Sequence, residues 1–337
     1  MMNRHPEHDI LLCYTVDAFG HIPNDKELFK PAVGYYQDGQ LKDFMYDSFI
    51  FLSSPNYLYD YFPGGYAHKS LNRQDFLNFI DEEMKEGFAI DALNAAVGEA
   101  KAKLNRPDYK ANVFMSLLYP ANTVKEFGVV EGKMRDLSVL EDRLAALRWM
   151  ADESIRQFNE KHFEHVSLSG FYWFCEEMEY EDQNKEMTQA TTAYIRSIGY
   201  KTCWCPWFGA PGFEDWKELG FDIATQQANF FPEHRKDWPN RGTQERLPAV
   251  AEWTRKIGIG VGMEMGDEQH GSAEVFKQYL ETGAREGFMH YPHIYYMGRG
   301  PQVVSKIYHS EDAYVREVYD ELYKYIHRTL KPEEVHL

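Results

Sequence analysis

Eight short apolar runs, separated by amphipathic helical stretches, are the feature that most limits how this chain can fold. The runs are continuous rather than alternating, which is typical of strands buried on both faces. Strands that alternate with helices pair in parallel, and eight such units close into a ring. The sequence therefore predicts an α/β fold, the (β/α)8 or TIM barrel. The predicted strands cover residues 9–15, 48–53, 112–118, 165–174, 201–207, 221–226, 258–264 and 288–296.

The stretches between the runs carry helix boundary signals. Ser138, with Glu141 three residues later, forms a capping-box pattern, and Gly199 and Gly220 follow two other stretches as helix-ending glycines. An open doubly wound sheet is the alternative fold, but it usually has a glycine-rich phosphate loop after its first strand, and residues 15–20 lack that pattern. The predicted helices cover residues 71–104, 138–162, 188–198, 213–219, 246–256, 272–285 and 312–330.

No repeat, low-complexity tract or linker interrupts this pattern, so we predict a single domain over residues 1–337 with its core at about 9–330. Two connections are long. Residues 16–47, after the first strand, show no helix pattern, and residues 55–70, after the second, contain Pro63-Gly64-Gly65. Long loops on a rigid scaffold usually carry function.

The charge balance limits the partners. Lys and Arg total 36 against 53 Asp and Glu, a net charge of −17, which disfavours binding to nucleic acid and to anionic membranes. No stretch reaches the ~20 apolar residues of a membrane helix. The first residues are polar and show no secretory leader. We therefore expect an extracytoplasmic location if a leader has been trimmed and a cytoplasmic one otherwise; nothing in the sequence sets the oligomeric state.

In a barrel of this kind the active site lies at the carboxyl ends of the strands. Glu264 ends the seventh predicted strand, and Glu176 and Glu177 follow the fourth. Side chains alternate along a strand, so only one of the last two faces inward. If Gly170 and Tyr172 share the inward face, Glu176 faces inward too, and it is preferred over Glu177. Two carboxylates facing one cleft are the equipment for cleaving a glycosidic bond.

Other residues near the strand ends are suited to binding a sugar. Aromatic side chains make up 15% of the chain, and their faces pack against the apolar faces of pyranose rings. Side-chain amides and carboxylates hydrogen-bond to hydroxyl groups. The predicted substrate-binding residues are Asp17, Tyr119, Trp173, Glu177, Trp207, Gln227, Asn229, Asp267 and Tyr296, with Trp204 as a further aromatic candidate.

Metal and cofactor signatures are missing from the sequence. The 13 histidines are scattered and form no HExxH pattern, and there is no nucleophile elbow or phosphate-binding Walker motif. We therefore expect no metal and no cofactor. The four cysteines, Cys13, Cys175, Cys203 and Cys205, do not match a zinc or redox spacing and are expected to be free thiols.

Several segments resemble one known family in both sequence and order. The segment Gly-Phe-Tyr-Trp-Phe-Cys-Glu at 170–176 resembles the signature of the domain-of-unknown-function 4855 (DUF4855) family, as do residues 43–52, 205–208, 227–231 and 262–264. The resemblance covers about residues 10–325 and implies a barrel similar to glycoside hydrolases. In the large glycosidase clan with this barrel, the acid/base glutamate follows strand four and the nucleophile follows strand seven, where Glu176 and Glu264 lie.

The leading prediction is a glycoside hydrolase acting on an oligo- or polysaccharide. Glu176 would protonate the glycosidic oxygen, and Glu264 would attack the anomeric carbon or activate water; carboxyl groups about 5–5.5 Å apart would mean retention and about 6.5–9.5 Å inversion. One alternative is a non-catalytic carbohydrate-binding barrel, in which the acids only hydrogen-bond to hydroxyls. Another is a metal-dependent barrel enzyme, such as an isomerase or deacetylase, with histidines and carboxylates around one ion.

Overall fold

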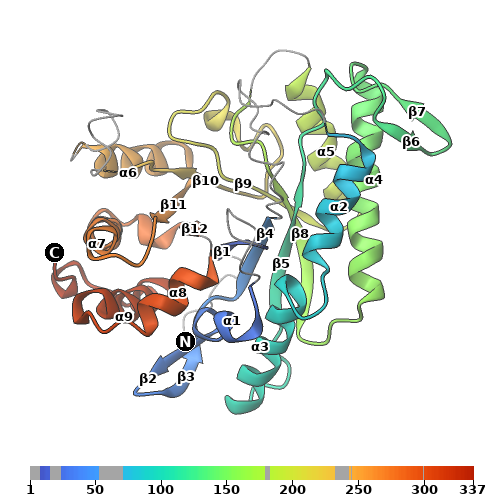
Figure 1. Cartoon of the computed structure of the whole chain (residues 1–337). Coiled ribbons are helices and arrows are strands. Elements are labelled where there is room, and N and C mark those ends of the chain that lie inside the picture. Colours follow the sequence, from blue (N-terminus) through green and yellow to red (C-terminus); the bar gives the residue numbers. More distant parts are fainter. Residues whose placement is uncertain are drawn as a thin grey trace.

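The computed structural model describes residues 8–15, 24–52, 71–178, 183–231, 243, 245–298 and 300–337. Eight strands of this described part form a closed parallel barrel in the order β1-β12-β11-β10-β9-β8-β5-β4. The fold is therefore the predicted (β/α)8 barrel, with its helices outside the strands (Figure 1). The barrel strands are β1 (Asp9–Tyr14), β4 (Ser48–Leu52), β5 (Ala111–Leu117), β8 (Val166–Trp173), β9 (Lys201–Trp204), β10 (Ile223–Gln227), β11 (Gly260–Met265) and β12 (His293–Met297).

All eight predicted strands are present, but the fifth and the eighth are clearly shorter than predicted. The fifth ends at Trp204 instead of residue 207, because Pro206 has no N–H to donate to a neighbouring strand. The eighth begins at His293 instead of residue 288. A 3₁₀ turn (Phe288–His290) precedes it, after Gly287 takes a left-handed φ of 85°.

The helices mostly follow the predicted segments. The predicted 71–104 helix is wrong in one respect: it is two helices, α2 and α3. The connection between them contains Gly87 with φ 79°, a left-handed conformation that glycine adopts readily. The predicted 213–219 helix is only a 3₁₀ turn (Phe213–Asp215). The helices are α1 (Lys26–Val33), α2 (Arg73–Glu83), α3 (Ala89–Lys103), α4 (Leu140–Glu160), α5 (Asn184–Ser197), α6 (Arg246–Ile257), α7 (His270–Glu286), α8 (Pro301–Tyr308) and α9 (Ala313–Ile326). A further 3₁₀ turn (Pro332–Glu334) follows α9.

The connection after β1 contains regular structure, so the prediction of a helix-free loop there is wrong. Helix α1 begins after Asp25, whose carboxylate accepts the Leu28 N–H at 3.1 Å, and a hairpin of β2 (Gly34–Gln37) and β3 (Gln40–Phe44) follows. The sequence pattern does not indicate this eight-residue helix, because it contains Pro31 and proline usually breaks helices. The predicted long loop at 55–70 lies outside the described residues.

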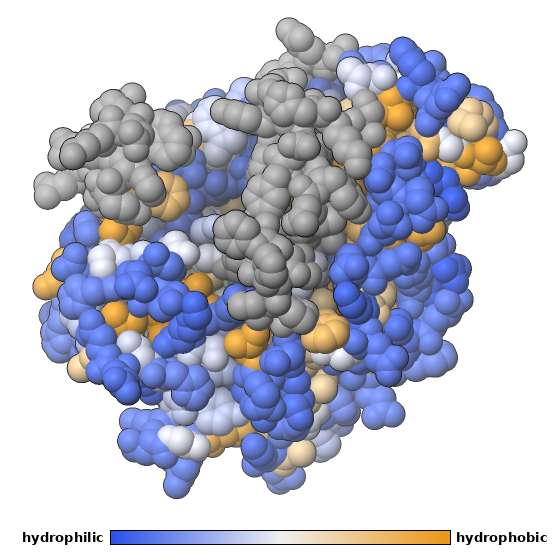
Figure 2. All heavy atoms as spheres, in the orientation of Figure 1, coloured by the Kyte–Doolittle hydropathy of each residue, from blue (hydrophilic) through white to orange (hydrophobic). Residues whose placement is uncertain are grey.

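A second hairpin, of β6 (Gly128–Val130) and β7 (Lys133–Arg135), projects from the barrel beside α4 (Figure 1). Val129 and Met134 are cross-strand partners on it and are both 53% exposed. Hydrophobic side chains show on this hairpin in Figure 2, on a face that is otherwise mostly hydrophilic.

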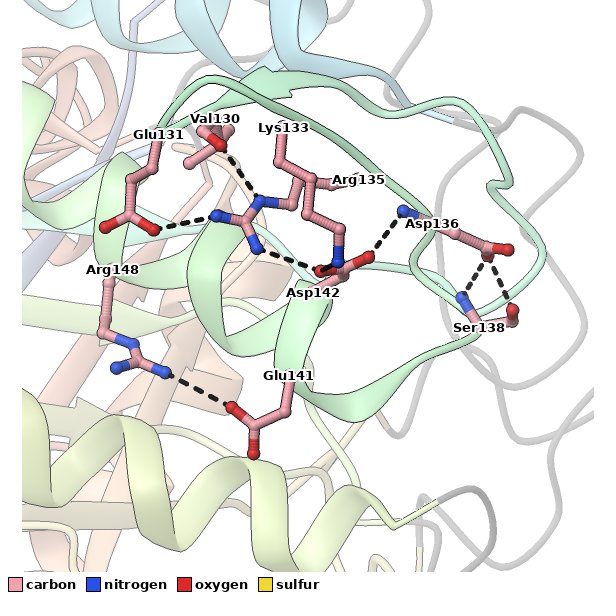
Figure 3. A network of polar contacts seen from close by, with 9 residues as sticks. All are labelled: Val130, Glu131, Lys133, Arg135, Asp136, Ser138, Glu141, Asp142 and Arg148. Atoms are coloured by element: carbon pink, nitrogen blue, oxygen red, sulfur yellow. Dashed lines mark hydrogen bonds and ion pairs between the residues drawn. The ribbon is translucent and has the colours of Figure 1, made fainter.

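Asp142 ties this hairpin to the first turn of α4 (Figure 3). Its carboxylate accepts hydrogen bonds from Lys133 Nζ (2.8 Å) and Arg135 Nη1 (3.0 Å), both on β7, and from the Asp136 N–H (3.0 Å). The Lys133 hydrogen bond is the largest cause that lowers the pKa of Asp142 to about 2. The predicted capping box is wrong, because Ser138 donates to Asp136 (2.6 Å) and α4 starts only at Leu140.

The first and last barrel strands close the ring. Strand β1 pairs with β12 in parallel, with Asp9 opposite His293. Arg328, just after α9, pairs with the carboxylate of Asp9, and the Tyr295 hydroxyl donates to the same carboxylate at 2.7 Å. The two ends of the described chain are thereby joined at the amino-terminal face of the barrel, away from the strand ends where barrel enzymes carry their chemistry.

Two further predictions concern the whole chain. All four cysteines are buried and free, as predicted. Within the described ranges, no helix combines the length and the apolar character needed to cross a bilayer.

Candidate active site

A cavity of about 240 Å³ opens at the carboxyl ends of the barrel strands, and both predicted catalytic glutamates line it. Glu176 follows β8 and Glu264 lies in β11. Tyr172 and Phe174 line the cavity together with Glu176, so the alternation along β8 continues past the strand end. Glu177 does not line it. The structure therefore brings Glu176, and not Glu177, to the same cavity as Glu264.

Among the described residues, Asn229 and Tyr279 hold Glu264 by hydrogen bonds. Its Oε2 accepts the backbone N–H of Asn229 (2.6 Å) and the hydroxyl of Tyr279 (3.0 Å), and its Oε1 is 3.4 Å from Asn229 Nδ2. The side chain is 5% exposed. Hydrogen bonds donated to a carboxylate favour its ionised form, so this site is built to hold a negative charge in a fixed orientation.

Glycines allow β11 to lie close to its neighbours below Glu264. A Cβ atom on Gly260 would collide with the carbonyl oxygen of Pro292, and one on Gly262 would come within 2.9 Å of the Gln227 Cα. Glycine at these two positions lets neighbouring backbone come close, and the structure shows this packing.

Asn229 connects the residues around Glu264. It has a left-handed φ of 48°, which asparagine tolerates better than most residues. Its Oδ1 accepts the Phe208 N–H (3.1 Å), and its Nδ2 donates to Gln227 Oε1 (3.0 Å). Backbone strain of this kind often marks a functional site, and here it aims the Asn229 N–H at Glu264.

Glu176 lies in a different environment. It is half-buried, and burial is the main cause that raises its pKa to about 7. The negative charges of Glu264 and Glu177 raise it further, while a hydrogen bond with Gln227 lowers it. Glu176 therefore keeps its proton up to about neutral pH, as a general acid must.

Three predicted binding residues lie together on the other side of β8. Tyr119, Trp173 and Glu177 line a separate hollow of about 10 Å³, which is large enough for about one water molecule. Glu177 Oε2 accepts from Trp207 Nε1 (3.1 Å), and the Tyr119 hydroxyl donates to Asn184 (2.8 Å). They support the wall behind Glu176 and do not line the main cavity.

The remaining predicted binding residues are divided. Gln227, Asn229 and Tyr296 line the main cavity. Asp267 is exposed and lies just before α7, where its carboxylate accepts from the Gln269 N–H (3.0 Å) and the Ser272 hydroxyl (2.6 Å). Trp204 is a core residue that donates to the Cys175 carbonyl at 2.7 Å. Asp17 lies outside the described residues.

Several cavity residues were not predicted. Tyr14 and Phe231 line it, and Tyr14 meets Tyr296 edge to face with ring centroids 6.5 Å apart. Tyr14 could have been predicted from the sequence, because it follows Leu12 by two positions on β1 and so shares the inward face. Tyr279, which reaches Glu264 from α7, gave no signal in a single sequence.

No group of three or more His, Cys, Asp and Glu side chains in the described ranges is arranged to hold a metal ion.

Comparison with known proteins places the chain in a family. The sequence profile described as "Domain of unknown function (DUF4855)" matches residues 9–324. The chain belongs to the DUF4855 family. No curated protein matches it.

Two solved structures resemble this DUF4855 protein in fold. One is the catalytic domain of a family GH18 chitinase from the fern Peteris ryukyuensis, with 11% identity and a TM-score of 0.46, over 93% of this chain and 99% of that one. The other is the GH18 chitinase ChiB from the chitin utilization locus of Flavobacterium johnsoniae, with 9% identity and a TM-score of 0.47, over 94% of both chains.

Tyr279 of the DUF4855 protein provides a test of how Glu264 is held. The Tyr279→Phe substitution removes one donor to Glu264 and the acceptor of the Phe230 N–H (3.3 Å). A hydrogen bond to a charged group contributes about 1.5–3 kcal/mol, so we expect kcat to fall about tenfold or more, with little change in KM. The acid limb of the pH–rate profile, where Glu264 takes up a proton, should also move to higher pH, because the lost hydrogen bond favoured the ionised form.

The matched control is Tyr325→Phe, a buried tyrosine on α9 whose hydroxyl lies 4.0 Å from the Met263 sulfur. It should leave kcat and the pH profile unchanged. A Tyr279→Phe protein with unchanged kcat and an unchanged acid limb would show that Tyr279 does not position Glu264.

Proposed function

We propose that this DUF4855 protein is a glycoside hydrolase. The observation that carries the proposal is that two glutamates from β8 and β11 line one cavity in opposite electrostatic environments. Burial raises the pKa of Glu176 to about 7, while hydrogen bonds from Asn229 and Tyr279 favour the ionised form of Glu264. Pairs of acids whose environments differ in this way are the acid and base of glycosidases.

In the proposed mechanism Glu176 donates its proton to the glycosidic oxygen as the bond to the anomeric carbon breaks. Glu264 stabilises the positive charge that develops on the sugar, either by attacking the anomeric carbon or by activating a water molecule. Glu264 does not have to reorganise for this, because Asn229 and Tyr279 already fix its carboxylate.

The aromatic side chains of the cavity are consistent with a carbohydrate substrate. Tyr14, Phe174, Phe231 and Tyr296 line it beside the glutamates. Aromatic faces pack well against the C–H faces of pyranose rings. The amides of Gln227 and Asn229 add polar groups that fix orientation.

The test is a turnover screen. Purified protein is incubated with plant and host polysaccharides and with 4-nitrophenyl glycosides, and released reducing ends or nitrophenol are measured. The Glu176→Gln/Glu264→Gln double variant, checked by circular dichroism, is the control. Hydrolysis by the unmodified protein, with none by the double variant, supports the proposal. Sugar binding without turnover would contradict it in favour of a carbohydrate-binding barrel.

A further inference from the structure

The cavity that holds the two glutamates has two chemically different halves. The polar half contains Glu176, Gln227 and Glu264, from β8, β10 and β11. The other half, which we call the aliphatic wall, consists of Leu12, Leu52 and Ile294, from β1, β4 and β12.

The strand order places Glu176 and Gln227 across the cavity from the aliphatic wall and Glu264 beside it. Strands β12, β1 and β4 are adjacent in the ring, with β1 in the middle. Four steps around the eight-stranded ring from β1, through β12, β11 and β10, lead to β9, which is therefore the strand across the barrel from β1. Strand β9 lies between β8 and β10, which carry Glu176 and Gln227. Strand β11, which carries Glu264, pairs with β12, and Ile294 lies opposite Gly262. A ring that presents its anomeric carbon to the two glutamates therefore turns its adjacent C5 edge toward the aliphatic wall.

The aliphatic wall continues the apolar interior of the barrel. Leu12, Leu52 and Ile294 are 7%, 3% and 1% exposed, and they form one cluster with Ile10 and Ile50 deeper in the barrel. Tyr14 and Tyr296 are the next inward residues on β1 and β12, toward the rim. The three wall side chains carry no hydrogen-bonding group, and Tyr14, which pairs with Leu52 in the register of β1 and β4, brings the nearest hydroxyl group on β1.

A sugar hydroxyl pressed against this wall would lose its water without gaining a partner from it, which costs free energy. A methyl group at the same place gains by leaving water. We propose that the reacting sugar is a 6-deoxyhexose, whose methyl group on C5 packs against Leu12, Leu52 and Ile294. This inference rests on the proposed function, since it assumes that Glu176 and Glu264 act at the anomeric carbon. An acetamido group also ends in a methyl, but it brings an N–H and a carbonyl that the wall leaves unpaired.

The test compares 4-nitrophenyl glycosides that differ only at C6. The pairs are β-D-fucoside with β-D-galactoside, α-L-fucoside with α-L-galactoside, and α-L-rhamnoside with α-L-mannoside. An apolar pocket discriminates against an added hydroxyl by up to about a hundredfold. We therefore expect kcat/KM to be about 10–100-fold higher for the 6-deoxy member of the accepted pair. Equal rates, a preference for the 6-hydroxy member, or a higher kcat/KM for the N-acetyl-β-D-glucosaminide would overturn the proposal.

A pair of variants links that preference to the wall. Leu12→Thr places a hydroxyl on the wall, whereas Leu11→Val changes the neighbouring residue of β1, which faces the helices. The 6-deoxy preference should shrink about tenfold or more in Leu12→Thr and persist in Leu11→Val. Because the comparison of substrates uses the unmodified protein, it stands even if Leu12→Thr fails to fold.

A binding measurement separates this inference from the proposed function. If no glycoside is hydrolysed, the proposed function fails. Calorimetric titration of the unmodified protein with L-fucose against L-galactose, and with L-rhamnose against L-mannose, then tests the wall alone. Tighter binding of a 6-deoxy sugar supports the aliphatic wall as a methyl site, and equal or undetectable binding of both members of every pair overturns it.

Discussion

Replacing Glu264 by glutamine is expected to lower kcat by about a thousandfold or more while the protein stays folded. The substitution keeps the shape of the side chain and its contacts with Asn229 and Tyr279 but removes the negative charge that stabilises the transition state. Preorganised electrostatic groups of this kind contribute about 10²–10³ in kcat, and loss of a covalent nucleophile costs more. Steady-state kinetics on the substrate found in the screen measure the effect.

Glu83→Gln is a suitable control for this variant. Glu83 is a fully buried glutamate at the end of α2, outside the cavity, and burial raises its pKa well above the ordinary value. Because burial favours the neutral form of this carboxyl group, the neutral glutamine is a close replacement, and activity should not change. Full activity of a folded Glu264→Gln protein would exclude Glu264 from the reaction.

The second large effect is expected at Glu176. Glu176→Gln removes the proton that the leaving oxygen needs, and general acids contribute about 10²–10⁴ in rate. The loss should be largest for substrates with poor leaving groups and small for nitrophenyl glycosides, whose leaving group needs little protonation. The comparison of kcat/KM on both kinds of substrate checks this.

The pH profile gives an independent readout. The pKa of Glu176 is raised to about 7, so this group is protonated and competent below that pH and loses its proton above it. Activity should therefore fall as the pH rises through about 7, and this alkaline limb should disappear in Glu176→Gln. Glu177→Gln is the matched control: it keeps an acceptor for Trp207 and should retain the activity and the limb. The limb should move to lower pH, because the charge of Glu177 contributes to the raised pKa of Glu176. If Glu177→Gln instead lost the activity and the alkaline limb while Glu176→Gln kept both, the general acid would be Glu177.

Much of the fold could be predicted because the barrel strands are buried on both faces and so appear as continuous apolar runs. The inward position of Glu176 followed from alternation with Tyr172. The same alternation places Trp173 on the outer face, where it lies beside Glu177. The prediction that Trp173 packs against a sugar is therefore inconsistent with the side-chain alternation that places Glu176 inward.

Other features depend on contacts between distant segments. Tyr279 is one buried residue of an amphipathic helix, and only the packing of α7 on β11 brings its hydroxyl to Glu264. Asp267 follows β11 by two residues, but the chain has already turned toward α7, so its carboxylate accepts hydrogen bonds from Gln269 and Ser272 at the start of that helix. Local spacing does not determine either position.

The way the ring closes has a consequence for how the chain folds. Strand β1 has β12 as one of its two neighbours, and Arg328 meets Asp9 across 319 positions of sequence. Contacts between such distant residues make folding slow. During synthesis β1 emerges first and keeps one edge unpaired until β12 has been made, and an unpaired edge invites pairing with other chains. The nascent protein is therefore most vulnerable to aggregation just before its last strand arrives.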